Sequence, residues 1–339
     1  MIDLIVAGGG PIGLMTAIHA RLAGMDVTVV EPRTGPIDKA CGEGLMPDAL
    51  SRLQAVGVDP PGQDFHGIRY IAGGAQVEAR FRSGPGRGVR RLELQSALLR
   101  RAEELGVGQT AHRVTTIRQG ADWVDAGGLR ARYIVGADGL HSRVRRSLGL
   151  EESARGQQRF GLRQHYGTKP WTDLVEVYWL SDAEVYVTPV GANTVGVALL
   201  GRAPLNLDAA IAQVPGLASR LQAAPRVSEQ RAAGPLRQHV SARSVGRAML
   251  VGDAAGYVDA LTGEGLRVGF AEAEAVVRAV LADHVDGYEH EWRRITRSYR
   301  WTTSGLLWAS SQRPLRPLIV PAARALPSVF GRIVDSLAT

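Results

Sequence analysis

The chain has 339 residues, 45% of them hydrophobic and 22% charged, with a formal net charge of +7 and an isoelectric point near 10.0. This composition excludes a disordered chain, and the single cysteine excludes an intramolecular disulfide framework and indicates a reducing compartment. The sequence shows no basic stripe with interleaved aromatics, so we expect no nucleic-acid partner. It also shows no signal peptide and no apolar run of about 18 residues, so we expect a cytoplasmic protein.

The N-terminal segment predicts a βαβ unit. Residues 2–7 (IDLIVA) form a short apolar run typical of a buried strand, and residues 11–23 have helical spacing that ends at Gly24. Residues 26–32 (DVTVVEP) then indicate a second strand.

The first turn of this unit carries a dinucleotide-binding pattern. Gly8, Gly10 and Gly13 have the G-x-G-x-x-G spacing between a strand and a helix, and Glu31 ends the next strand. Such glycines permit a tight turn and a close approach to a pyrophosphate at the helix N-terminus, while the glutamate accepts hydrogen bonds from ribose hydroxyls. The predicted contacts are Gly8, Gly10, Pro11, Ile12, Gly13, Glu31, Pro32 and Arg33.

A glycine-rich loop, DKACGEGLMP, follows at residues 38–47 and holds the only cysteine, Cys41. Beyond it, residues 65–82 alternate as strands do, and residues 90–107 form the clearest amphipathic helix of the chain. The other elements predicted up to residue 137 are a helix at 48–56 and strands near 111–118 and 129–137.

The middle of the chain is rich in strands and its end in helices. Four stretches between about 158 and 200 alternate as in an antiparallel sheet, and helices are predicted at 207–223, at 265–282 and after 289. These patterns predict an α/β fold with a discontinuous Rossmann-like nucleotide-binding domain, an inserted antiparallel sheet domain that binds substrate and a helical C-terminal segment. The predicted boundaries are 1–64, 84–157 and 244–288 for the first, 65–83 and 158–243 for the second, and 289–339 for the third.

Two further turns follow predicted strands. In VGADGLHSR, Asp138 and Gly139 end a strand before a series of arginines that includes Arg143. In LVGDAAGYVDALTGEGL, Gly252 and Asp253 end a strand, and the aspartate is placed to bind a sugar or ribityl hydroxyl. The turn that opens the long helix there consists of Gly263, Glu264, Gly265 and Leu266, whose amides face whatever lies at the helix N-terminus.

In this order, the three motifs resemble those of the FAD-dependent family that includes para-hydroxybenzoate hydroxylase-like monooxygenases, flavin-dependent halogenases and geranylgeranyl reductases. The resemblance spans about residues 1–285 and includes an R-x-x-L-x-x-x-L helix. It implies one non-covalent FAD, reduced transiently by NAD(P)H, with the flavin ring over the inserted sheet. The further FAD contacts that it implies are Cys41, Gly42, Gly44, Arg91, Gln95, Val114, Asp138, Gly139, Arg143, Gly252, Asp253, Gly263, Glu264, Gly265 and Leu266.

Two details resemble the geranylgeranyl reductase branch. KACGEG is similar to its lysine-x-cysteine-glycine-glycine loop, and GDAAGYVDALTGEG is similar to its third motif. In contrast, Ala260 stands where the family usually has proline, and YVTPVG keeps Tyr186 and Pro189 but not the aromatics of the reductases. The halogenase motifs have no counterpart, which disfavours halogenation.

Two activities stay open from the sequence. The shortness of the chain and the missing aromatics favour a monooxygenase that uses NAD(P)H and O2. Such an enzyme would act through a flavin C4a-hydroperoxide to hydroxylate or epoxidise a hydrophobic substrate. The expected substrate is a phenolic, polyketide or isoprenoid compound of secondary metabolism. The alternative is hydride transfer from reduced FAD to an isoprenoid or lipid double bond; a non-catalytic flavin-binding protein is the least favoured.

The candidate catalytic residues are few. Cys41 is expected beside the flavin, while His165 and His239 could act as general bases towards a phenol. Tyr186 is the fourth catalytic candidate. The side chains predicted to line the substrate pocket are Tyr166, Tyr178, Trp179, Tyr186 and Pro189.

The C-terminal tail combines apolar side chains with arginines over residues 305–339. The simpler interpretation is a helical cap on the fold. The other is that the tail covers an apolar substrate entrance or touches a membrane surface. We expect a monomer or homodimer.

Overall fold

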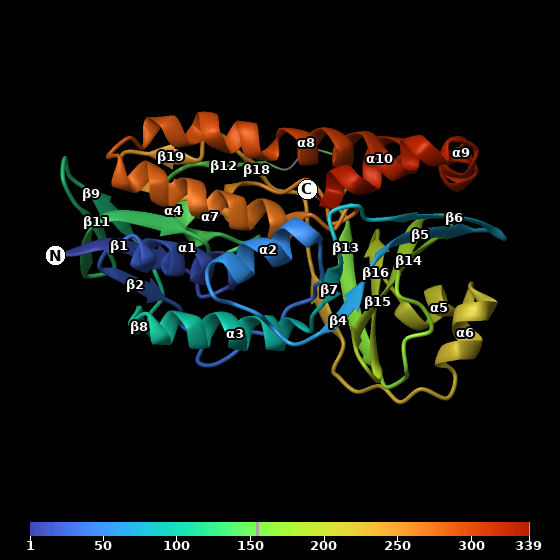
Figure 1. The fold of residues 1–339 in the computed structure, drawn as a ribbon. Coiled ribbons are helices and arrows are strands. Elements are labelled where there is room, and N and C mark those ends of the chain that lie inside the picture. Colours follow the sequence, from blue (N-terminus) through green and yellow to red (C-terminus); the bar gives the residue numbers. More distant parts are fainter. Residues whose placement is uncertain (154–155, 339) are drawn as a thin grey trace.

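The computed structural model of the protein describes residues 1–153 and 156–338. Figure 1 shows an α/β layer structure on the side of the N-terminus and a second sheet beside it, with the C-terminal helices laid along both. This arrangement confirms the predicted fold class of a Rossmann-like domain with an inserted sheet and a helical tail.

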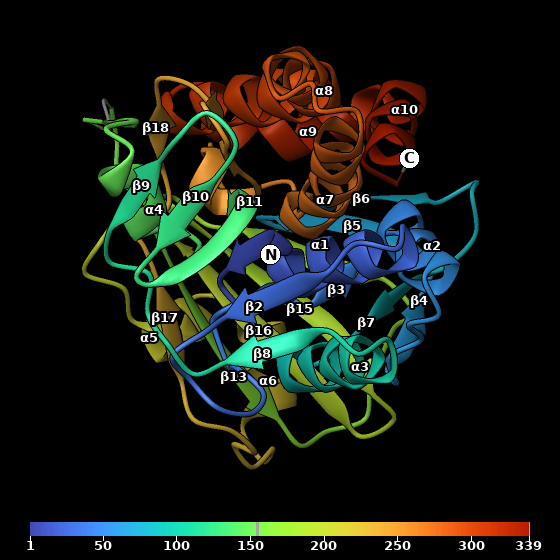
Figure 2. The same cartoon turned by 90° about the vertical axis from the view of Figure 1, so that its left-hand side faces the viewer.

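The first sheet joins strands from three distant parts of the chain. Its strands are β1 (Ile2–Ala7), β2 (Val27–Val30), β8 (Gly108–Thr110), β9 (Ile117–Gln119), β10 (Val124–Ala126), β11 (Leu129–Gly136), β19 (Ser244–Val245) and β20 (Ala248–Leu250). In the order β19-β20-β11-β1-β2-β8, β1 lies between β2 and β11 and runs parallel to both (Figure 2). The carboxyl ends of these strands therefore share one edge of the sheet, where ligands of such folds bind.

Helices pack against this sheet and against one another. They are α1 (Pro11–Leu22), α2 (Pro47–Ala55), α3 (Arg91–Glu104), α4 (Arg143–Ser147) and α7 (Gly265–Leu281), with the short turn η1 (Gly252–Ala255). Pro11 begins α1 at a position where its missing amide has no helical partner to lose, and the chain reverses at Gly24 with a φ of 81°. Because α1 packs against both α3 and α7, its position is fixed from two sides.

The second sheet has the strand order β17-β13-β16-β15-β14-β5-β6. Its strands are β5 (Gly67–Ala72), β6 (Ala75–Arg80), β13 (Phe160–Tyr166), β14 (Val175–Trp179), β15 (Ala183–Gly191), β16 (Thr194–Gly201) and β17 (Arg231–Ala233). Neighbours pair antiparallel except β5 and β14, which run parallel because β5 enters the sheet from the first domain and not through a hairpin. Every residue of β14 is buried, so both faces of the sheet are covered there.

A small sheet that the sequence did not predict holds the Cys41 loop. It consists of β3 (Gly44–Leu45), β7 (Gly86–Gly88) and β4 (Gln63–Phe65), while β12 (Glu151–Glu152) pairs with β18 (His239–Val240) elsewhere. A Cβ on Gly88 would lie 1.7 Å from the carbonyl oxygen of Pro189, so only glycine lets β7 approach β15 this closely.

Two predicted elements differ from the structure. The helix predicted at 207–223 is two helices, α5 (Leu207–Ala212) and α6 (Pro215–Leu221), because Pro215 begins a new helix. Most of the strand predicted near 111–118 is not a strand, since β8 ends at Thr110 and β9 begins only at Ile117.

The C-terminal segment packs first on α7 and then on the second sheet. Its helices are α8 (Asp286–Ser311), η2 (Arg316–Leu318), α9 (Ile319–Ala325) and α10 (Pro327–Ala338). Phe330 of α10 packs on Tyr70 of β5, with ring centroids 5.0 Å apart. Arg316 donates to buried Glu184, which also pairs with Arg159, and Arg159 in turn bonds Asp259 at 3.1 Å. This buried ion network ties the tail and the second sheet to the segment before α7.

Candidate cofactor and active site

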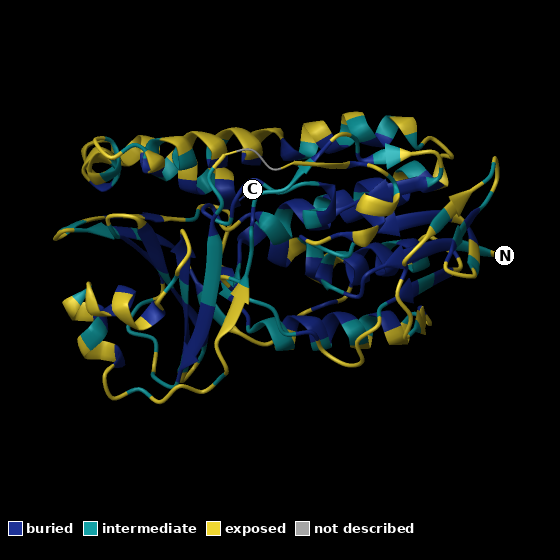
Figure 3. Cartoon of the chain, turned by 180° about the vertical axis from the view of Figure 1, so that it is seen from behind, coloured by how far each residue is buried: buried dark blue, intermediate teal, exposed yellow. Residues whose placement is uncertain are grey.

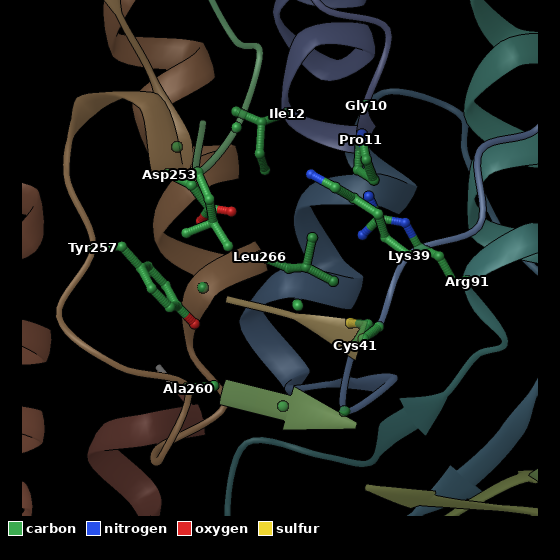
Figure 4. Close-up of a pocket in the computed structure, with 18 of the residues that line it drawn as sticks. Gly10, Pro11, Ile12, Lys39, Cys41, Arg91, Asp253, Tyr257, Ala260 and Leu266 are labelled. Carbon is green, nitrogen blue, oxygen red and sulfur yellow. The ribbon is translucent and has the colours of Figure 1, made fainter. Parts of the chain in front are cut away.

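One large cavity of about 640 Å³ lies between the two sheets. It is lined by the turn after β1, the Cys41 loop, the segments after β11 and β20, the N-terminus of α7 and the second sheet. Figure 4 shows the side chains of Ile12, Cys41, Asp253 and Leu266 around it. All the predicted cofactor contacts line this cavity except Gly13, Gln95 and Glu264. The three motifs that lie far apart in the sequence are therefore brought together.

The turn after β1 explains two of the exceptions. A Cβ on Gly13 would lie 1.9 Å from the carbonyl oxygen of Gly8, so Gly13 permits helix and turn to pack. Gln95 of α3 donates to the carbonyl oxygen of Gly9 at 2.5 Å and fixes the turn from behind. A Cβ on Gly10 would meet nothing within 4 Å, because Gly10 faces the open cavity.

Glu31 lies at the far end of the cavity, after β2. Its Oε2 accepts a hydrogen bond from the amide of Gly9 at 2.9 Å, and its Oε1 pairs with Arg33 at 2.7 Å. Although burial opposes ionisation, the hydrogen bonds from Arg33 and Gly9 hold the pKa of Glu31 below its ordinary value. The carboxylate is thus ionised and oriented as a hydrogen-bond acceptor.

Two aspartates differ in their roles. Asp138 accepts hydrogen bonds from the hydroxyl of Ser142 and the amides of Arg143 and Val144, at 2.5, 2.6 and 3.2 Å, so it stabilises the start of α4. Asp253 points into the cavity (Figure 4), and its burial raises the pKa of its carboxyl group. A hydroxyl-bearing ligand would satisfy this carboxylate.

Behind Asp253, a buried glutamate of α7 supports the turn. Glu272 is 2% exposed, and its Oε2 accepts a hydrogen bond from the amide of Gly252 at 2.5 Å. Burial raises the pKa of Glu272 to about 8, so the native protein holds its proton at neutral pH.

Replacing Glu272 by glutamine is expected to make the protein more stable than wild type, by a margin that grows as the pH rises. A carboxyl group with a raised native pKa binds a proton more tightly when folded, so the contribution of Glu272 to wild-type stability falls by about 1.4 kcal/mol per pH unit between 4.5 and about 8. The variant keeps the acceptor for Gly252 but does not titrate. Denaturant unfolding of both proteins across this interval measures the difference, and parallel pH profiles would contradict it.

The Cys41 loop is clamped by a residue that the sequence analysis missed. Glu43 is 3% exposed, and its backbone has a φ of 60°. Its Oε1 accepts a hydrogen bond from the amide of Arg91 at 2.8 Å, and its Oε2 lies 2.6 Å from Nε2 of His165. Glu43 stands at the second glycine of the lysine-x-cysteine-glycine-glycine pattern, where a positive φ favours glycine. A charged residue at that position was the signal that could have identified it.

The two predicted general bases lie outside the cavity lining. His165 is 2% exposed and lies between Glu43 and Ser228, whose Oγ is 2.9 Å from Nδ1 of the histidine. His239 belongs to β18, which pairs with β12. The geometry therefore does not support either histidine as a base that contacts substrate; His165 instead positions Glu43.

The part of the cavity formed by the second sheet is apolar. Its wall includes Ile68, Tyr70, Val175, Val177, Leu236 and, from α10, Leu337. Of the five predicted pocket residues, Tyr186 lines the cavity and donates its hydroxyl to the carbonyl oxygen of Leu261 at 2.9 Å. Tyr166 and Tyr178 pack instead in the core beneath α5 and α6, and Trp179 packs on Tyr70.

Known proteins share these features over most of the chain. Residues 1–296 match the family described as FAD binding domain. The chain is 30% identical to menaquinone reductase of Mycobacterium tuberculosis over 79% of this chain and 73% of that protein. It is 28% identical to digeranylgeranylglycerophospholipid reductase 1 of Methanopyrus kandleri, over 86% and 85%.

Among solved structures, that of p-nitrophenol 4-monooxygenase from Pseudomonas putida superposes with a TM-score of 0.80. It covers 100% of this chain and 98% of its own, at 18% sequence identity. At this identity the similarity shows a common fold alone.

Proposed function

We propose that this chain, which belongs to the FAD binding domain family and is an FAD-dependent oxidoreductase, reduces a carbon–carbon double bond of a hydrophobic isoprenoid substrate. The observation that carries the proposal is the apolar cavity wall that extends from the Cys41 loop to α10. A wall of this kind fits a hydrocarbon chain and offers no ionisable base on the second sheet.

The residues of the cavity fit FAD. Gly10 opens on the cavity where a pyrophosphate would approach, and Lys39 and Arg91 lie beside it in Figure 4 as cationic partners for phosphate. Glu31 would accept hydrogen bonds from the adenosine ribose, and Asp253 from the ribityl chain. Bound FAD, once reduced, supplies a hydride.

Hydride addition to a double bond leaves the neighbouring carbon to take up a proton. The thiol of Cys41 lines the cavity and accepts a hydrogen bond from the amide of Glu43 at 3.4 Å, which fixes its direction. Tyr186 is a poorer donor, because burial raises the pKa of its hydroxyl well above the ordinary value and its proton is held by Leu261. We therefore assign proton donation to Cys41.

Two considerations support reduction over the oxygenation that the sequence analysis favoured. His165 and His239 lie outside the cavity lining, so neither of the two predicted bases contacts the substrate space. The two relatives compared above are both named as reductases, one of menaquinone and one of a digeranylgeranylglycerophospholipid.

The experiment that tests this proposal separates the two reactions by oxygen. The FAD-loaded protein is reduced without O2 and mixed with a menaquinone or a geranylgeranyl lipid, and flavin reoxidation and product mass are followed. The expected result is a product formed anaerobically that stays heavier by two hydrogen atoms after air has oxidised any quinol back to the quinone. A product that requires O2 and gains one oxygen atom would overturn the proposal in favour of a monooxygenase.

Replacing Cys41 by serine is expected to slow anaerobic product formation by about tenfold, because a hydroxyl is a weaker proton donor than a thiol. FAD content and the rate of flavin reduction by NAD(P)H should stay at wild-type values, since the loop keeps its shape. Single-turnover absorbance measurements resolve the two half-reactions. Unchanged product formation would return Cys41 to a structural role.

A further inference from the structure

The outer surface of the C-terminal helices exposes large apolar side chains. Trp301 is 84% exposed and Trp308 62% exposed, and their spacing of seven residues places both on one face of α8. The exposed set, here called the C-terminal face, comprises Trp301, Trp308, Leu318, Leu326, Val329 and Ile333. Figure 3 shows exposed residues along the outer side of these helices, so nothing in the described chain covers them.

The same surface is positively charged. Between residues 297 and 338 the sequence has one acidic residue, Asp335, and this side chain pairs with Arg82 at 3.2 Å. The exposed arginines of the segment are Arg297, Arg300, Arg313, Arg324 and Arg332. Exposed tryptophans interspersed with arginines match the headgroup region of a bilayer that contains anionic lipid.

The inner side of α10 is occupied. Phe330, Val334 and Leu337 are at most 4% exposed, and Leu337 lines the cavity. Among the described residues no single helix is long and apolar enough to cross a membrane. The helices Arg316–Ala325 and Pro327–Ala338 reach the necessary length and composition only when taken together, and they meet at a bend of 104°. Because their inner side is held by the second sheet, these helices can offer a bilayer only their outer side.

We infer that the C-terminal face docks on the surface of a bilayer with anionic phospholipid headgroups. Trp301 and Trp308 would enter the interface while Arg324 and Arg332 contact the headgroups. If the proposed function holds, α10 stands between the lipid and the cavity, where an isoprenoid substrate dissolved in the bilayer can reach Leu337. The docking itself requires only the exposed face.

Vesicle flotation of the FAD-loaded protein tests this inference. We expect binding to equimolar phosphatidylcholine and phosphatidylglycerol vesicles and weaker binding to phosphatidylcholine alone. Trp301→Ser combined with Trp308→Ser should lower the partition coefficient by about tenfold or more on both compositions. Arg324→Gln combined with Arg332→Gln should lower it on the anionic vesicles alone.

Matched controls carry the same substitutions elsewhere on the surface. Leu22→Ser with Leu281→Ser changes side chains that are 49% and 54% exposed, and Arg118→Gln with Arg202→Gln removes exposed charge; both should float like wild type. Point variants are preferable to deletion of the tail, because Phe330 and Leu337 belong to the core.

Three results would overturn the docking. The first is a wild-type protein that does not float with anionic vesicles, and the second is a double tryptophan variant that floats as well as wild type. The third is a wild-type dimer, shown by light scattering, that does not bind vesicles and that the tryptophan substitutions dissociate. Turnover distinguishes the two proposals. Flotation without turnover of any isoprenoid would refute only the function. Docking and function both hold if the variant loses activity on vesicle-embedded substrate and keeps it on detergent-dissolved substrate.

Discussion

A Gly13→Ala protein is expected to purify without FAD. The added Cβ would lie 1.9 Å from the carbonyl oxygen of Gly8, so the first turn of α1 must move away from the loop that approaches the pyrophosphate. Because α1 is held by α3 and α7, it cannot move as a unit, and the strain amounts to about 3 kcal/mol or more. This energy corresponds to a loss of about a hundredfold or more in FAD affinity.

The ratio of flavin to protein absorbance after purification, followed by titration with FAD, measures this effect. Gly216→Ala in α6 is the matched control, since a Cβ there meets nothing within 4 Å. The control should hold a full complement of FAD, with a stability equal to wild type or greater by up to about 1 kcal/mol. A yellow Gly13→Ala protein with wild-type affinity would contradict the role assigned to the turn.

The second large effect is expected at Glu43. Replacing it by alanine removes the acceptor for the amide of Arg91 and leaves the buried side chain of His165 without its carboxylate, while Arg163 keeps Asp38 as its partner. Breaking a buried ion pair on one side costs about 3–5 kcal/mol. We therefore expect a lower melting temperature, weak FAD retention and a displaced Cys41 loop.

Three variants separate the causes. Glu43→Gly should be about 1 kcal/mol more stable than Glu43→Ala, because the backbone φ of 60° is unstrained for glycine. Glu43→Gln keeps an acceptor for Arg91 and should be the mildest. Glu103→Ala, at an exposed position of α3, is the control. If all three Glu43 variants melt like the control, the carboxylate does not clamp the loop.

Most of the cofactor site was predictable because its signals are local. The turn at Gly8–Gly13 and the helix start at Gly263–Leu266 each lie within a few residues, and their backbone conformations restrict which residues fit. The family resemblance implied that the three motifs meet at one cavity. The structure confirms the fold on which that expectation depends. The same local character explains the correct bounds of α1 and α7.

The substrate side was not predictable from alternation. β14 is buried on both faces, under α6 on one side and α10 on the other, so its pattern does not tell which side chains line a cavity. Tyr178 was accordingly placed in the pocket and lies in the core. The contact between Glu43 and His165 joins residues 122 positions apart, and no short-range pattern reveals it.

The order of strands β20-β11-β1-β2 has a consequence for biosynthesis. The central strand β1 leaves the ribosome first, but its neighbour β11 and the next strand β20 follow only after more than a hundred further residues each. A nascent chain thus cannot complete the lining of this cavity until Leu266 and then Leu337 have emerged. Contacts of such long sequence separation slow folding, so we expect capture of the proposed cofactor to be a late event in folding.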